Sequence, residues 1–118
     1  MNAPLAIVCD DCATQALQLS RMLVALGCRV QILAFDQLLL PLAEAPAVVC
    51  VELFGAAHNG FKQLRHWRRH YDCKLLLISA SGRCTDDAWG VLAGATAVLQ
   101  RPFNAAALAQ YLPVVRAA

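Results

Sequence analysis

The sequence predicts a single α/β domain, a three-layer sandwich in which helices cover both faces of a parallel sheet. Short apolar runs alternate along the chain with segments of helical periodicity, which is typical of repeated strand-helix units. Two of the runs, residues 48–54 and 74–78, contain continuous apolar stretches, as strands buried on both faces require. The chain has 118 residues, 59% of them hydrophobic and 15% charged, so we expect one domain over residues 1–118.

Five strands are expected because each is a short run rich in apolar residues that stops at polar or small residues. In chain order they are residues 5–9, 29–34, 48–54, 74–78 and 96–100. The run at 29–34 begins by alternating polar and apolar side chains, which favours a place nearer the edge of the sheet.

Helical stretches follow the strands, with apolar side chains at the helical period. In chain order they are residues 13–26, 36–45, 61–71, 85–94 and a last helix capped by Asn104. Gly27 supplies the stop of the first helix, and Pro41 limits the second to a turn or two. Pro113 is expected to kink or shorten the last helix. Right-handed crossovers between these units predict a doubly wound sheet.

Composition excludes several classes of protein. A net charge of +2 is too small to indicate binding to nucleic acid or to an acidic membrane. No apolar run approaches the ~20 residues that span a bilayer. Asp10 and Asp11 interrupt the apolar run that a signal peptide would need. We therefore expect a cytoplasmic domain that does not contact the membrane.

The six cysteines are expected to be reduced. Four of them lie within or beside apolar runs, where cysteine behaves as a small hydrophobic residue: Cys9, Cys28, Cys50 and Cys73. Cys9 and Cys12 have the C-x-x-C spacing of thiol redox motifs, but two carboxylates stand between them. Like-charge repulsion raises the pKa of a thiol, which disfavours a reactive thiolate and hence a redox role.

Polar residues stand at the ends of four strands. Asp10 and Asp11 follow the first strand, and Glu52 comes near the end of the third. Ser79 follows the fourth strand and Arg101 the fifth. With a strand order of 2-1-3-4-5, the first and third strands end side by side at the topological switch point. Three carboxylates there need a hard cation such as Mg²⁺ or an internal guanidinium. The competing interpretation is that Glu52 only begins a solvated loop.

Five motifs in this order and spacing resemble the receiver domains of bacterial two-component response regulators, over nearly the whole chain. They are Ile7-Val8-Cys9-Asp10-Asp11, Leu26-Gly27-Cys28-Arg29-Val30, the segment 46–53, Ser79-Ala80, and Gly94-Ala95 followed by Arg101-Pro102-Phe103. The resemblance implies a flavodoxin-like (βα)5 fold with strand order 2-1-3-4-5. It also implies a phosphoacceptor position at residue 52 and Mg²⁺ held by the acidic pair, residue 52 and the backbone carbonyl of Phe54.

Several positions depart from the pattern of that family. Glu52 stands where the family has the phosphoacceptor Asp, and its extra methylene moves the carboxylate by roughly 1.5 Å. In-line phosphoryl transfer tolerates such misplacement poorly. Arg101 replaces the family's Lys with a larger, planar group. Val98 replaces the aromatic side chain that commonly rotates on phosphorylation, and Ala56 replaces a loop Pro.

These departures predict a pseudo-receiver, a signalling domain that is not an enzyme and has no catalytic residue. An ion pair between Glu52 and Arg101 would replace part of the phosphate and metal network, so no cofactor is required, although Mg²⁺ could still bind. Whether Glu52 mimics the phosphorylated state or locks the inactive one stays open. The alternative is a Mg²⁺-dependent phosphoacceptor domain that is phosphorylated at Asp10 or Asp11.

Without phosphotransfer, the remaining function would be docking to a protein partner or to a covalently linked effector domain. The resemblance implies a homodimer or partner face on the fourth helix, fifth strand and fifth helix, where Trp89, Val98 and Tyr111 fall. The competing interpretation places Trp89 and Tyr111 in the core.

One cluster, residues 65–70, is basic. Nucleic-acid binding is its alternative reading, but a solvated helix face is favoured because no second basic element accompanies it. His66 and His70 have a spacing that could hold a metal, yet no third ligand is evident.

Overall fold

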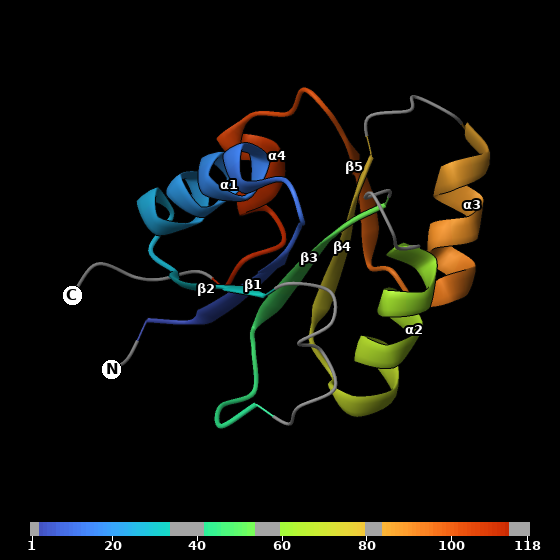
Figure 1. The fold of residues 1–118 in the computed structure, drawn as a ribbon, viewed down its shortest axis with the longest axis horizontal. Coiled ribbons are helices and arrows are strands. Elements are labelled where there is room, and N and C mark those ends of the chain that lie inside the picture. Colours follow the sequence, from blue (N-terminus) through green and yellow to red (C-terminus); the bar gives the residue numbers. More distant parts are fainter. Residues whose placement is uncertain (1–2, 34–41, 54–59, 80–83, 114–118) are drawn as a thin grey trace.

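A computed structural model describes residues 3–33, 42–53, 60–79 and 84–113 of the chain (Figure 1). In chain order its elements are β1 (Leu5–Cys9), α1 (Ala13–Ala25), β2 (Arg29–Leu33), β3 (Val48–Glu52), α2 (Gly60–His70), β4 (Lys74–Ser79), α3 (Cys84–Ala93), β5 (Ala97–Gln100) and α4 (Ala105–Ala109). All five predicted strands are present, with bounds that differ by at most two residues from the predicted ones.

The five strands form one parallel sheet in the order β2-β1-β3-β4-β5, which confirms the predicted fold. The register places Ile7 of β1 opposite Gln31 of β2 on one side and Val49 of β3 on the other. Helices α1 and α4 cover one face of the sheet and α2 and α3 cover the other (Figure 1). This arrangement is the three-layer sandwich that alternating strands and helices predict.

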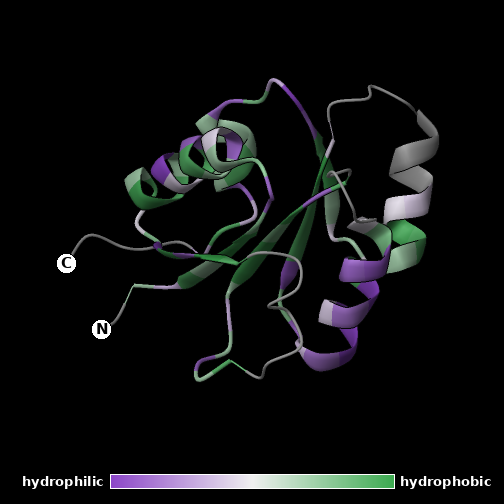
Figure 2. Cartoon of the chain, in the orientation of Figure 1, coloured by the Kyte–Doolittle hydropathy of each residue, from purple (hydrophilic) through white to green (hydrophobic). Residues whose placement is uncertain are grey.

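The core consists of two apolar clusters, one on each face of the sheet. Strands β1 and β3 are buried along their whole length, which is why their sequences are apolar on both faces (Figure 2). On the α2 and α3 face, Leu64 and Trp67 of α2 pack against the sheet. On the other face, Leu23 of α1 and Leu108 of α4 do the same. Strand β2 is mostly exposed, in agreement with its edge position.

Two helical predictions differ from the structure or fall partly outside it. Of the stretch 36–45, residues 36–41 lie outside the described residues, and residues 42–45 are not helical, so the expected helix does not reach its predicted end. The last helix begins as predicted, because the Asn104 side chain accepts a hydrogen bond of 2.9 Å from the Ala107 amide. It ends at Ala109 and continues as turns in which the amides of Tyr111 and Leu112 donate to the carbonyls of Leu108 and Ala109. Pro113 then prevents any further helix, as expected.

The helices of the described ranges are short or amphipathic. None of them combines the length and apolar character that crossing a bilayer demands.

Candidate functional site

The polar residues at the strand ends gather at the carboxyl edge of the sheet. Asp10 follows β1, Glu52 is the last residue of β3 and Ser79 is the last residue of β4. All three are buried, with 7%, 8% and 1% of their surfaces exposed. Arg101 follows β5, and its backbone amide donates a 2.7 Å hydrogen bond to the Ser79 carbonyl. The parallel strands therefore bring two carboxylates and one guanidinium into a single site.

The guanidinium of Arg101 lies between the two buried carboxylates. Its Nη2 atom is 3.2 Å from Oε2 of Glu52 and 3.6 Å from Oδ2 of Asp10. One nitrogen thus serves both acids, instead of the two-pronged grip that Arg often makes on one carboxylate. The Cζ atom of Arg101 also lies 5.8 Å from the centre of the Phe103 ring, within the range of a cation–π contact. Arg101 is the internal guanidinium that the sequence suggested could balance the carboxylates at this edge, and here it lies against Asp10 and Glu52.

Burial governs the charge of Glu52. Removal from water raises the pKa of the Glu52 carboxyl above its ordinary value, and the negative charge of Asp10 raises it further. The hydrogen bond and positive charge of Arg101 act in the opposite direction and lower that pKa. Desolvation is the largest of these effects, so the pKa of Glu52 is raised although Arg101 opposes the shift.

The two members of the acidic pair have different surroundings. Asp10 is buried, and its Oδ1 atom accepts a 2.8 Å hydrogen bond from the Cys12 amide, at the start of α1. Asp11 is exposed to solvent. Asp10 therefore belongs to the same buried group as Glu52 and Arg101, while Asp11 lies at its rim.

The other predicted site residues that the structure describes lie outside this group. Phe54 lies outside the described residues. Val98 is half-buried beneath α3, where the methyl of an alanine at position 90 would come within 2.7 Å of it. Tyr111 packs on the opposite face of the sheet, against the cluster of α1 and α4. Trp89 is 56% exposed on α3, so the interpretation that places it in the core is wrong.

The structure offers these residues no clear metal site. Among the described residues, no three His, Cys, Asp or Glu side chains are grouped so that they could hold a metal ion. Asp10 and Glu52 both face the Arg101 guanidinium. A Mg²⁺ ion prefers six oxygen ligands in an octahedron. The Arg101 guanidinium lies against one carboxylate oxygen of Asp10 and one of Glu52 that such an ion would need. Within the described residues, a Mg²⁺ ion bound to Asp10 and Glu52 would therefore compete with Arg101 for the same oxygen atoms.

The basic cluster at residues 65–70 is not one continuous cationic face. Trp67 is buried, and Arg68 is turned inward. The rings of His66 and His70 lie 4.6 Å apart, but Nδ1 of His70 is 2.9 Å from the His66 carbonyl oxygen. That contact holds the His70 ring against its own helix.

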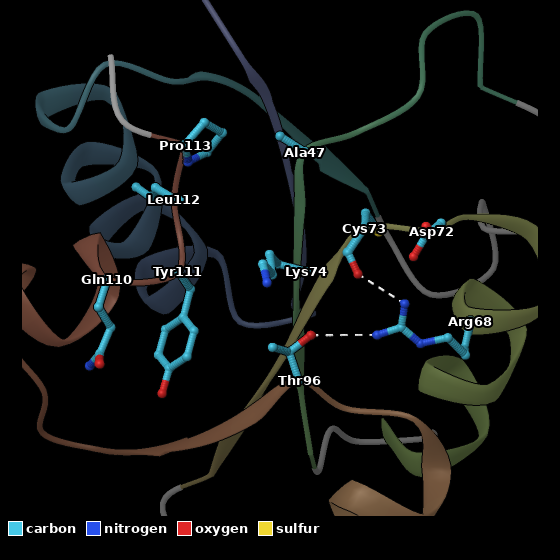
Figure 3. Close-up of a pocket in the computed structure, with 10 residues that line it drawn as sticks. All are labelled: Ala47, Arg68, Asp72, Cys73, Lys74, Thr96, Gln110, Tyr111, Leu112 and Pro113. Carbon is cyan, nitrogen blue, oxygen red and sulfur yellow. Dashed lines mark hydrogen bonds between the residues drawn. The ribbon is translucent and has the colours of Figure 1, made fainter. Parts of the chain in front are cut away.

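Sequence reasoning missed the structural role of Arg68. Its guanidinium donates to the Gly94 carbonyl at 2.9 Å and to the Cys73 carbonyl at 2.9 Å, and Nη2 lies 3.4 Å from Oγ1 of Thr96. These bonds join the end of α3 to α2 and to the start of β4. Arg68 lines a cavity of about 460 Å³ at the amino ends of the strands (Figure 3). Because Arg68 uses its donors on carbonyls, that cavity has no free guanidinium to offer a ligand.

The described cysteines are all free thiols: Cys9, Cys12, Cys28, Cys50 and Cys73. Burial raises the pKa of the Cys9 thiol above its ordinary range and that of Cys50 to about 12. Cys12 is exposed and Cys9 is not, so the C-x-x-C spacing lacks the accessible, acidic thiol pair of a redox motif.

Comparison with known proteins identifies the fold. No protein-family model matches the sequence, and no curated protein matches it significantly. A response regulator from Burkholderia pseudomallei, solved with a phosphorylated aspartic acid, a calcium ion and citrate, has a TM-score of 0.82 and 23% identity. The receiver domain of the Francisella response regulator 1452 has a TM-score of 0.77 and 19% identity. Response regulator DrrB from Thermotoga maritima, an OmpR/PhoB homolog, has a TM-score of 0.78 and 24% identity.

These matches cover nearly all of this chain but only part of two relatives. They span 93%, 91% and 93% of this chain, and 66%, 91% and 50% of the Burkholderia, Francisella and Thermotoga chains. The structural neighbours are thus response regulators, and this chain has the fold of their receiver domains.

Proposed function

We propose that this chain is a pseudo-receiver, a signalling domain that acts through protein–protein interaction and is not switched by ordinary phosphotransfer. Its partner would be a separate protein or a covalently linked effector domain, and it would act in the cytoplasm. The proposal rests on the receiver fold and on the residues at the carboxyl edge of the sheet.

One observation carries the proposal: Arg101 forms an ion pair with Glu52 and lies close to Asp10. In a receiver that is phosphorylated, the residue at position 52 must be free to attack a phosphoryl group. Here the carboxylate at that position faces a guanidinium 3.2 Å away and is largely buried. A nucleophile held in this way is badly placed for in-line transfer, because attack needs close alignment of the reacting atoms.

The charges support the same conclusion. Arg101 contributes one positive charge to a site with two buried carboxylates, Asp10 and Glu52. The guanidinium therefore does part of what a divalent cation would do, and we infer that the domain requires no cofactor. A carboxylate carries less charge and fewer oxygens than a phosphoryl group, so Glu52 could imitate a phosphorylated residue only in part.

Intact-mass spectrometry after incubation with acetyl phosphate and Mg²⁺ tests the proposal. The wild-type chain is expected to gain no phosphoryl group. Glu52→Asp and the double variant Glu52→Asp with Arg101→Lys are the matched comparisons, because they restore the acceptor alone or with its usual cation. An adduct on either variant would show that the rest of the pocket is still competent.

An adduct on the wild type would overturn the proposal. It would favour the alternative, a Mg²⁺-dependent receiver phosphorylated at another acidic residue, and Asp10→Asn and Asp11→Asn would then identify the acceptor. Asp11 is the exposed one of the two and is the first to test.

A further inference from the structure

Helices α2 and α3 lie side by side on one face of the sheet (Figure 1). Side chains of both helices line a groove. Its volume is about 550 Å³, and it is lined by Phe61, Lys62 and Arg65 of α2 and by Trp89 of α3. We call these four residues the α2–α3 groove. None of its lining residues belongs to the Asp10, Glu52 and Arg101 group at the strand ends.

The α3 side of the groove is unusually apolar for an exposed surface. Trp89 is 56% exposed and Leu92 is 77% exposed. The two residues are three positions apart on a helix, so they share one side of α3. Large side chains of this kind are the usual anchors of protein interfaces, Trp above all. Exposed Trp and Leu side by side indicate a surface that a partner covers.

The α2 side of the groove is cationic. Lys62, Arg65 and Arg69 are all exposed and follow one another at helical spacing, so they form a single stripe. The α2 sequence contains no acidic residue. Within the described part of the chain, no carboxylate forms an ion pair with any of the three. Figure 2 shows this hydrophilic helix beside the apolar end of α3.

We propose that the α2–α3 groove binds an acidic, amphipathic segment of a partner protein. Apolar side chains of that segment would cover Trp89, and its carboxylates would face Lys62 and Arg65. This inference rests on the proposed function, because it names the kind of partner through which the domain would act. The groove differs from the expected interface on the fourth helix, fifth strand and fifth helix, because none of its lining residues lies on β5 or α4.

Charge complementarity selects this occupant over two others. A second copy of the chain, packed about a two-fold axis, would place the basic stripe near its own symmetry mate, and like charges there repel. A nucleic acid would use the positive charges but would leave Trp89 and Leu92, 56% and 77% exposed, without an apolar partner. An acidic amphipathic segment would cover the apolar side chains of α3 and place negative charges beside the cationic side chains of α2.

The test is selection of a phage-displayed library of helical peptides, about four turns long, on the immobilised wild-type chain. We expect enriched peptides with acidic residues on one face and large apolar residues on the other. Synthetic copies of those peptides should bind the chain at least about tenfold more weakly after Trp89→Ala, and likewise after the double reversal Lys62→Glu with Arg65→Glu. All three positions are exposed or line the groove, and circular dichroism melts will verify that the variants fold.

Matched controls are available on the other helical layer. Leu17 and Arg21 of α1 are exposed, so Leu17→Ala and Arg21→Glu change the same kinds of side chain away from the groove. Peptide affinity should be the same for these variants as for the wild type.

Several results would overturn the inference. They are the absence of any enriched peptide, enrichment of basic peptides, and binding that survives the groove variants. Trp89-dependent dimerisation in sedimentation, or Lys62- and Arg65-dependent binding of a fluorescent oligonucleotide without peptide binding, would assign the groove to another occupant. A phosphoryl adduct on the wild type would instead contradict only the proposed function, so the two failures are distinguishable.

Discussion

At the scale of single residues, the carboxyl edge of the sheet shows how a buried acid is tolerated. Burial removes most of the hydration of Glu52, which is unfavourable for its charge. The ion pair with Arg101 offsets part of this free-energy cost. Desolvation commonly exceeds the attraction within a buried ion pair, and the raised pKa of Glu52 indicates that it does so here. The attraction between Glu52 and Arg101 is thus favourable, although burying the charge of Glu52 costs more free energy than this attraction supplies.

This balance predicts a pH dependence. A carboxyl whose pKa is higher in the folded chain binds its proton more tightly there than in the unfolded chain. The wild type should therefore gain stability relative to Glu52→Gln as the pH falls through the folded pKa of Glu52 toward the ordinary value of 4.5. Urea unfolding of both proteins over this range measures the difference. Loss of relative stability on acidification would show that the pKa is lowered instead.

Arg68 gives a second prediction at this scale. It donates hydrogen bonds to the carbonyls of Gly94 and Cys73, and its neighbour Arg69 is exposed. Arg68→Ala should lower the free energy of unfolding by about 2 kcal/mol, because it leaves carbonyls without their charged donor. Arg69→Ala is the matched control and should change it by less than about 0.5 kcal/mol. Equal effects in chemical denaturation would contradict the structural role of Arg68.

At the scale of elements, the end of α3 depends on a glycine. Gly94 has a φ of +108°, and its amide donates to the Val91 carbonyl at 3.0 Å. A Cβ at this position would lie 3.0 Å from Cβ and Cγ of Arg68. The backbone conformation and the close approach of α2 both require glycine here.

Gly94→Ala is therefore expected to destabilise the fold by about 1–2 kcal/mol from backbone strain alone, with the contact to Arg68 adding to it. Gly27→Ala is the comparison, because Gly27 also has a positive φ, of 97°, but ends α1 on the other face of the sheet. Thermal melts of the two variants should show the larger loss for Gly94→Ala. A smaller loss than for Gly27→Ala would mean that α2 and α3 adjust freely.

Element by element, the sequence predicted the strands better than the helix ends. The strands were recognisable because β1, β3 and β4 are buried and nearly all apolar. Pro113 predicted a short α4, but it only prevents the helix from passing about residue 112, so its end at Ala109 did not follow from the sequence. The inward turn of Arg68 could not be predicted, because its partners Gly94 and Thr96 are more than 25 positions away in the sequence.

At the scale of the whole molecule, the topology explains why distant residues form one site. The order β2-β1-β3-β4-β5 places the ends of β1 and β3 side by side, which brings Asp10 near Glu52. The residue types and the strand order together predicted this convergence and named Arg101 as the available cation. The sequence did not predict that one guanidinium nitrogen would serve both acids, since that depends on side-chain geometry.

The same scale explains the placement of Trp89. The family resemblance grouped it with Val98 and Tyr111, which pack on opposite faces of the sheet. Val98 packs with the cluster of α2 and α3 and Tyr111 with that of α1 and α4. Which side of α3 Trp89 occupies follows only from how that helix packs on the sheet.

A double-mutant cycle on Glu52 and Arg101 tests the central claim most directly, namely that Arg101 is the built-in counter-ion of this site. The cycle compares urea unfolding of the wild type, Glu52→Gln, Arg101→Met and the double variant at neutral pH. We predict a favourable coupling of about 1–3 kcal/mol, with Arg101→Met the more damaging single change because it removes the positive charge that lies beside two buried carboxylates. A coupling near zero, with Arg101→Met harmless, would contradict the account.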